Sequence, residues 1–146
     1  MQALPHLYTI KAQAKSDSYL DVTGENLPQI EVAPPIGFNG PGDIWSPEDL
    51  LMSSVASCTI LSFKAIARAS KLDWISIECV SEGVLDRVER KTQFTKIVTK
   101  AKLIIPTDGD TDKAEKLLHK AEESCLISNS LTAESLIECE VIIESS

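Results

Sequence analysis

The strongest constraint on the fold is a segment that begins at Ser46 and contains no helix-breaking residue until about Lys71. Ser46 suits a helix N-cap, Pro47 suits the first helical position, and the acid at Glu48 suits the positive end of the helix dipole. The first half of the segment, LLMSSVASCTILSF, is apolar or small on every face. This pattern is typical of a helix surrounded by protein, so we predict a long buried central helix.

The flanking sequence predicts strands and one further helix. Three short strand-like segments lie within residues 7–34, and the Pro- and Gly-rich residues 34–43 predict an irregular loop. After the long helix we predict strands at residues 74–86, 92–106 and 133–145, and a helix at residues 112–125. A chain of 146 residues suits one domain, so we expect a single α+β domain over residues 1–146.

The charge and hydropathy patterns exclude several functional classes. Fourteen Lys and Arg residues against 22 Asp and Glu give a net charge of −8, which repels nucleic-acid backbones. The longest uncharged stretch in the middle of the chain, Leu50–Phe63, has 14 residues, whereas a membrane-spanning helix needs about 20. The N-terminus lacks the pattern of a secretory signal. We therefore expect a cytoplasmic protein with no membrane or nucleic-acid partner, whose thiols are free.

Cysteine is the residue type in this chain that is best suited to catalysis or metal binding. The four cysteines are Cys58, Cys79, Cys125 and Cys139. None has the CxxC spacing of a metal site, and His6 and His119 form no ligand pattern with them, so we expect no metal and no cofactor. We interpret His119 as solvent-facing. Cys79 and Cys139 lie on the apolar faces of predicted strands, which favours a role in core packing.

The other two cysteines lie in different surroundings. Cys58 lies in the middle of the long helix among small residues, and Cys125 ends the apolar side of the second helix before a polar run. Taken alone, each is read as a buried thiol, because a nucleophilic thiol needs an electropositive partner. Taken alone, Glu48 is explained by the favourable interaction of its carboxylate with the positive end of the helix dipole. It precedes Cys58 by ten residues, or about 15 Å of helix rise, so a joint role requires a third group between them.

Two segments taken together resemble the OsmC/Ohr family of thiol-dependent peroxidases (osmotically inducible protein C-like, organic hydroperoxide resistance). They are PPIGFNGPGDIWSPEDLLMSSVASC and HKAEESCLISNSL. The family pattern is a Pro-Glu-(x)-Leu helix start with a Cys ten residues after the Glu, followed later by a C-x-(I/V)-S segment. Here these positions are Glu48, Cys58 and residues 125–128. The order of predicted elements also fits, so the resemblance covers nearly the whole chain.

The resemblance implies a fold and an activity. The fold would be an intertwined α+β homodimer whose long central helices pack on antiparallel sheets. Cys58 would be the peroxidatic thiolate that attacks an organic or lipid hydroperoxide, and Cys125 the resolving thiol. A dithiol of the lipoyl type would reduce the resulting disulfide, and Glu48 would belong to the catalytic site. Candidate walls of an apolar substrate pocket are Phe38, Ile36 and Trp45.

The sequence departs from this family at one position. Peroxide-reducing members carry an Arg, before the long helix, that hydrogen-bonds the thiolate and is held by the helix-start Glu. This chain has no Arg before Arg68, and its first 63 residues contain only two lysines, Lys11 and Lys15. Lys15 could substitute as a point charge, or Arg68 or Arg87 could reach the site from another strand or from a partner subunit.

Three functional hypotheses remain open from the sequence. The first is a hydroperoxide reductase that uses Cys58 and Cys125. The second is a non-enzymatic protein of the same fold that binds a hydrophobic ligand or senses oxidation through the same pair. In the third, all four cysteines are structural.

Overall fold

The N-terminal part of the chain forms a small antiparallel sheet. The computed structural model describes residues 1–145, and the chain divides into two compact units, of which the first comprises Met1–Leu50. Its elements are the strands β1 (Lys11–Gln13), β2 (Leu20–Thr23) and β3 (Ile30–Val32) and the 3₁₀ helix η1 (Ile36–Phe38). The sheet order is β1-β2-β3. The three short strands are confirmed, and η1 adds one regular turn to the predicted irregular loop.

A reciprocal pair of hydrogen bonds fixes the start of the long helix α1 (Pro47–Ala69). The Asp49 backbone N–H donates to Ser46 Oγ at 3.0 Å, and the Ser46 N–H donates to Asp49 Oδ2, also at 3.0 Å. Each side chain thus satisfies a backbone donor that the first helical turn leaves unpaired. The predicted cap at Ser46 is confirmed.

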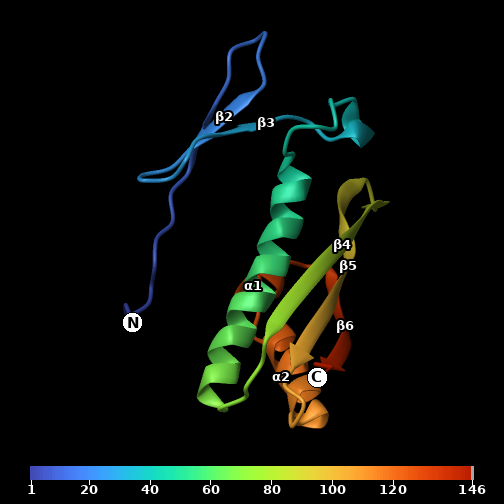
Figure 1. Cartoon of the computed structure of the whole chain (residues 1–146). Helices are drawn as coiled ribbons and strands as arrows, with labels where there is room; N and C mark the ends of the chain where they lie inside the picture. Colours follow the sequence, from blue (N-terminus) through green and yellow to red (C-terminus); the bar gives the residue numbers. More distant parts are fainter. Residues whose placement is uncertain (146) are drawn as a thin grey trace. The chain divides into compact units, whose positions relative to one another are not determined.

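The second unit, which begins at Leu51, contains the rest of α1 and a three-stranded sheet (Figure 1). Its further elements are β4 (Ser76–Val88), β5 (Lys91–Ile105), α2 (Thr111–Glu123), α3 (Leu126–Asn129) and β6 (Glu134–Ile143). The sheet order is β4-β5-β6, with β4 antiparallel and β6 parallel to β5. The α+β class is confirmed, but the expectation of purely antiparallel sheets is wrong for β6. The helical crossover through α2 and α3 brings the chain back in the same direction, which a tight hairpin cannot do.

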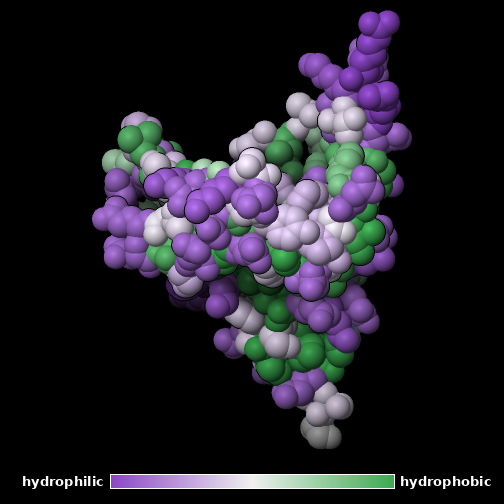
Figure 2. Space-filling view, turned by 90° about the horizontal axis from the view of Figure 1, so that it is seen from above, coloured by the Kyte–Doolittle hydropathy of each residue, from purple (hydrophilic) through white to green (hydrophobic). Residues whose placement is uncertain are grey.

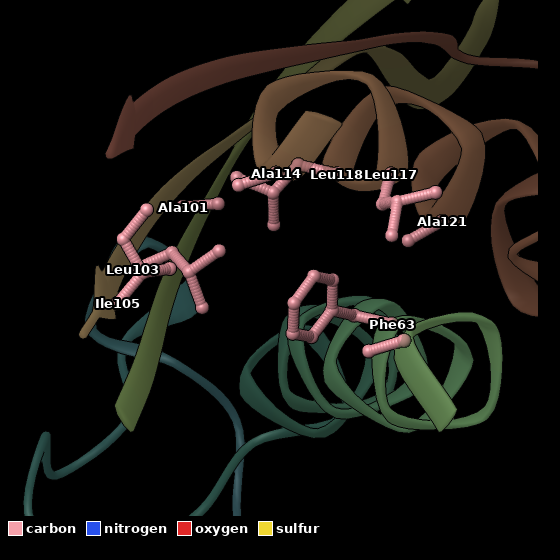
Figure 3. Packing of buried hydrophobic residues seen from close by; sticks show 9 residues of the cluster. Phe63, Ala101, Leu103, Ile105, Ala114, Leu117, Leu118 and Ala121 are labelled. Carbon is pink, nitrogen blue, oxygen red and sulfur yellow. The ribbon is translucent and has the colours of Figure 1, made fainter. Parts of the chain in front are cut away.

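One face of this sheet packs against α2 and the C-terminal half of α1. Phe63 of α1 points toward Leu103 of β5 and Leu118 of α2 (Figure 3), and all three are fully buried. Phe63 also meets Trp74 edge to face, with 5.6 Å between ring centroids. Burying a side chain of this size stabilises the fold by about 1.5–3 kcal/mol, so this cluster fixes where α1 lies within the second unit.

A glycine permits the close approach of α1 to the β4–β5 hairpin. A Cβ added at Gly83 of β4 would lie 2.7 Å from Met52 Sδ and 2.9 Å from ring atoms of Phe94. Such contacts are shorter than real Cβ atoms make, so any larger residue at position 83 would force the side chains of Met52 and Phe94 to shift.

The burial of α1 differs from the sequence prediction. In the single chain the helix buries one stripe, in which a buried residue recurs at every fourth position: Val55, Thr59, Phe63 and Ala67. On another face Leu61 is 65% exposed, and Ser53 and Ser57 are exposed as well. A helix that is apolar on every face indicates that every face is covered, but the pattern does not say by which chain.

By length and composition, α1 is also the one helix among residues 1–145 that could cross a membrane, with a mean hydropathy of 1.6 in its most apolar window. The core helix of a soluble protein can have the same composition. Since Phe63 and Ala67 belong to the core cluster with α2 and β5, α1 has the packing of a core helix.

Apolar side chains also reach the surface of the single chain, where Figure 2 shows hydrophobic residues among hydrophilic ones. The most exposed large ones in the first unit include Leu7, Tyr8, Leu4 and Ile36. In the second unit Leu61 and Leu126 are about two-thirds exposed, at 65% and 66%.

Candidate active site

The fold brings Cys58 and Cys125 together within the second unit. Cys58 lies in the middle of α1, and its side chain is close enough to Cys125 to contribute to the lowering of the Cys125 pKa. Cys125 does not end α2 as the sequence predicted, because α2 stops at Glu123. Cys125 is instead the N-cap of the short helix α3, and its sulfur accepts from the Ser128 backbone N–H. Ser124 is the C-cap of α2, so the chain leaves this helix before it reaches Cys125.

Hydrogen bonds surround the Cys125 sulfur. The Ser128 hydroxyl donates to Cys125 Sγ at 3.3 Å and the Ser128 N–H donates at 3.5 Å. Burial acts to raise the pKa of this thiol. The two Ser128 donors, with smaller contributions from the Cys58 thiol and the Ile127 N–H, outweigh burial and hold the pKa of Cys125 below its ordinary value. Sequence reasoning used Ser128 only as a motif position, although a Ser three residues after an N-cap is placed to donate to it.

The two remaining cysteines pack against the core. Both Cys79 of β4 and Cys139 of β6 pair with Ala101 of β5, one on each side, and lie at the edge of the core cluster. Burial is the main cause that raises the pKa of each thiol to about 11, with Glu78 and the neighbouring thiol adding to the effect at Cys79. These thiols are protonated at neutral pH, which agrees with the predicted packing role.

Glu48 lies in the first turn of α1, within the first unit. Its Oε1 is buried, and among residues 1–145 no group forms a hydrogen bond with it. Glu48 lines a cavity of 460 Å³ together with Phe38, one of the three candidate pocket walls. The other two, Ile36 and Trp45, are 71% and 53% exposed and are not among the described residues that line this cavity. The remaining lining residues are Ser18, Tyr19, Leu20, Val32, Ala33, Pro34, Pro35 and Pro47.

Sequence reasoning missed the contribution of Tyr19 and Leu20 to this cavity. Leu20 is the first residue of β2, a strand of four residues that is partly buried throughout, and Tyr19 directly precedes it. A strand this short shows no clear alternation, so its sequence gave no sign of which side chains turn inward.

The three cations proposed as substitutes for the family Arg are all exposed. Lys15 lies in the turn between β1 and β2, Arg68 in the last turn of α1, and Arg87 near the end of β4. Arg68 follows Cys58 by ten residues, or about 15 Å of helix rise. Hydrogen bonds, rather than any of these cations, account for the lowered pKa of Cys125.

As for metals, within the described residues no group of three or more His, Cys, Asp and Glu side chains is arranged to hold an ion. His119 is exposed on α2, as its sequence context predicted.

A family model described as OsmC-like protein matches residues 40–140, a range that contains Glu48, Cys58 and Cys125. The chain belongs to the OsmC-like family. The predicted resemblance is therefore confirmed, on a match that covers more than half of the sequence.

Comparisons with individual proteins agree with this membership. The chain is 26% identical over 113 residues to the uncharacterized protein YmaD of Bacillus subtilis, covering 75% of each chain. It superposes on an OsmC-like protein of unknown function from Vibrio cholerae with a TM-score of 0.84 at 19% identity, covering 93% of this chain and 100% of that one. It also superposes on an organic hydroperoxide resistance protein from Legionella pneumophila with a TM-score of 0.70 at 26% identity, covering 94% and 99%. The OsmC fold is thus established for this chain.

Proposed function

We propose that this OsmC-like chain reduces organic or lipid hydroperoxides with Cys58 as the peroxidatic residue and Cys125 as the resolving residue. The observation that carries the proposal is the proximity of these two cysteines, through which the Cys58 side chain helps to lower the pKa of Cys125, in a chain of this family. The similarity to a protein named for organic hydroperoxide resistance supports the same class of substrate.

The reaction takes three steps. The Cys58 thiolate attacks the distal oxygen of the hydroperoxide, the O–O bond breaks, and a sulfenic acid and an alcohol form. Cys125 attacks the sulfenic sulfur, water leaves, and the Cys58–Cys125 disulfide forms. A dithiol of the lipoyl type then reduces the disulfide and becomes a cyclic disulfide itself, which returns both thiols to their starting state.

Several further assignments belong to this proposal. Glu48 serves the catalytic site through a third group, and Phe38 forms part of an apolar wall that favours apolar substrates. The protein works in the cytoplasm as a homodimer of single-domain chains (residues 1–146). Exposed apolar surface, such as Leu61 on α1, supports the homodimer because a second copy would cover it.

The test is consumption of cumene hydroperoxide by the purified, pre-reduced protein with dihydrolipoamide as reductant. We expect turnover in the parent, none above background in Cys58→Ser, and at most one equivalent consumed by Cys125→Ser. Cys139→Ser is the matched control, because it changes a thiol that packs at the core edge, and it should keep most of the turnover. Equal rates in the parent and in Cys58→Ser would contradict the proposal.

Two observations favour a second candidate function, a redox sensor of the same fold. The chain lacks an Arg before Arg68, and Glu48 Oε1 has no partner among residues 1–145. A sensor would form the Cys58–Cys125 disulfide reversibly with hydroperoxide but would not turn over. Stoichiometric disulfide formation without catalytic consumption would therefore favour this function over the peroxidase.

A further inference from the structure

We propose that Ser128 stabilises Cys125 as the thiolate leaving group when a dithiol reduces the Cys58–Cys125 disulfide. This inference rests on the proposed function, because it concerns the recycling step of the same thiol pair. It assigns Ser128 a positioning role that acts through the sulfur of Cys125.

The first argument is the unequal burial of the two sulfurs. Cys125 is fully buried, whereas Cys58 is only half-buried. Since Cys58 is the more exposed of the two residues, we expect an external thiolate to attack Cys58 Sγ rather than Cys125 Sγ. The direction of attack decides which sulfur leaves: a new S–S bond forms between the dithiol and Cys58, the bond to Cys125 breaks, and its electron pair stays on Cys125.

The second thiol of the dithiol completes the exchange. It attacks the dithiol sulfur of the mixed disulfide, so that the reductant leaves as a cyclic disulfide and Cys58 leaves as a thiol or thiolate. Two electrons and two protons pass from the dithiol to the protein in total. The rate depends on how well Cys125 carries negative charge, since a thiol of lower pKa leaves faster.

Two hydrogen-bond donors are already placed around Cys125. The Ser128 hydroxyl at 3.3 Å and N–H at 3.5 Å already point at this sulfur in the reduced chain. Ser128 is itself buried, at 7% exposure, so little water competes for its hydroxyl. Donors that are fixed before the reaction stabilise the developing charge without reorganisation. A hydrogen bond to a charged group is stronger than one to a neutral group, so its effect is larger on the leaving thiolate than on the disulfide.

The experiment starts from protein oxidised with diamide, so it requires no hydroperoxide. Reduction of the disulfide by dihydrolipoamide is followed by alkylation of the released thiols and mass spectrometry. We expect Ser128→Ala to slow reduction by about tenfold, because the lost hydrogen bond is to a developing charge. Ser128→Thr, which keeps the hydroxyl, should restore most of the rate. Ser130→Ala is the matched control, because the Ser130 hydroxyl bonds the Leu126 carbonyl at 2.7 Å on the same short helix and does not touch the thiols.

A second readout separates this role from a structural one. In a Cys58→Ser background, thiolate absorbance at 240 nm reports Cys125, because Cys79 and Cys139 have pKa values of about 11. Ser128→Ala should move the Cys125 titration upward by about one pH unit, which corresponds to the same tenfold factor. Ser128→Gly removes the same hydroxyl and decides the question if the alanine variant does not fold.

Several outcomes overturn the proposal. They are a Ser128→Ala variant reduced as fast as the parent, an unchanged titration, or no Cys58–Cys125 disulfide after diamide. A chain that shows the Ser128 effect but does not consume hydroperoxide would contradict the peroxidase function and leave the role of Ser128 in disulfide reduction supported.

Discussion

The four cysteines have the same side chain, and their surroundings give them different chemistry. Cys79 and Cys139 lie on a sheet face where burial raises the pKa of each to about 11. Cys125 is more deeply buried, yet its pKa is lowered because Ser128 donates two hydrogen bonds to its sulfur. At the scale of single residues, hydrogen-bond donors decide whether the pKa of a buried thiol is raised or lowered.

The raised pKa values predict a loss of stability in alkali. Above pH 9 the unfolded chain ionises its thiols, whereas folded Cys79 and Cys139 keep their protons until about pH 11. Between pH 9 and pH 11, ionisation of these thiols therefore stabilises the unfolded state relative to the folded state. Each thiol lowers the free energy of unfolding by up to about 1.4 kcal/mol per pH unit. Urea unfolding at pH 8 to 11 should show a shallower fall in Cys79→Ala/Cys139→Ala than in the parent. Cys58→Ser, which keeps both strand thiols, should retain the steep fall; equal slopes in all three would contradict the assignment.

Among the elements, α1 depends on the capping box at its start. Ser46→Ala removes the acceptor of the Asp49 N–H in a buried position, so we expect a loss of about 1 kcal/mol in the free energy of unfolding. Urea unfolding monitored by circular dichroism measures this loss. Lys116→Ala on the exposed face of α2 is the control and should change stability by less than about 0.5 kcal/mol. Equal losses in the two variants would mean that the cap does not stabilise α1.

The β4–β5 hairpin closes with a turn that its residues do not favour. Val88 pairs with Lys91, and the two residues between them, Glu89 and Arg90, have φ of 50° and 75°. A two-residue turn with positive φ at both positions prefers Asn-Gly. Replacing the pair with Asn-Gly should stabilise the chain by about 1 kcal/mol and raise the Tm by several degrees. Replacing both with Ala removes the same charges but keeps the strain, so a rise in Tm as large as that of Asn-Gly would contradict this explanation.

The elements that the sequence predicted best are those with a local signal. The cap at Ser46 and the alternation around Ile77 and Cys79 depend on neighbouring residues alone, and both are confirmed. The parallel direction of β6 depends on the path of α2 across the sheet, which no local pattern encodes. The sequence did not predict the break between α2 and α3, because Cys125 fits the apolar stripe of α2. In the structure Cys125 is instead the N-cap of α3, where its sulfur accepts a hydrogen bond from the Ser128 N–H.

At the scale of the whole molecule, the described chain leaves its most apolar helix partly uncovered. The buried stripe of α1 faces the core of the second unit, while Leu61 is 65% exposed. An exposed leucine alone is ordinary, but here it lies on a helix with small or apolar residues on every side. Together with the exposed Leu7 and Tyr8, this composition favours association with a second copy, as the family resemblance implies.

We expect a charge on the exposed face of α1 to prevent dimer formation. Leu61→Glu should convert the dimer to a monomer in analytical ultracentrifugation, because a carboxylate buried against a second copy has no partner to offset its desolvation. The substitution should leave each chain folded, since Leu61 makes little contact within its own chain. Lys116→Glu on the exposed face of α2 controls for added negative charge and should remain dimeric. A parent chain that sediments as a monomer, or a Leu61→Glu variant that stays dimeric, would mean that the uncovered face of α1 has another occupant.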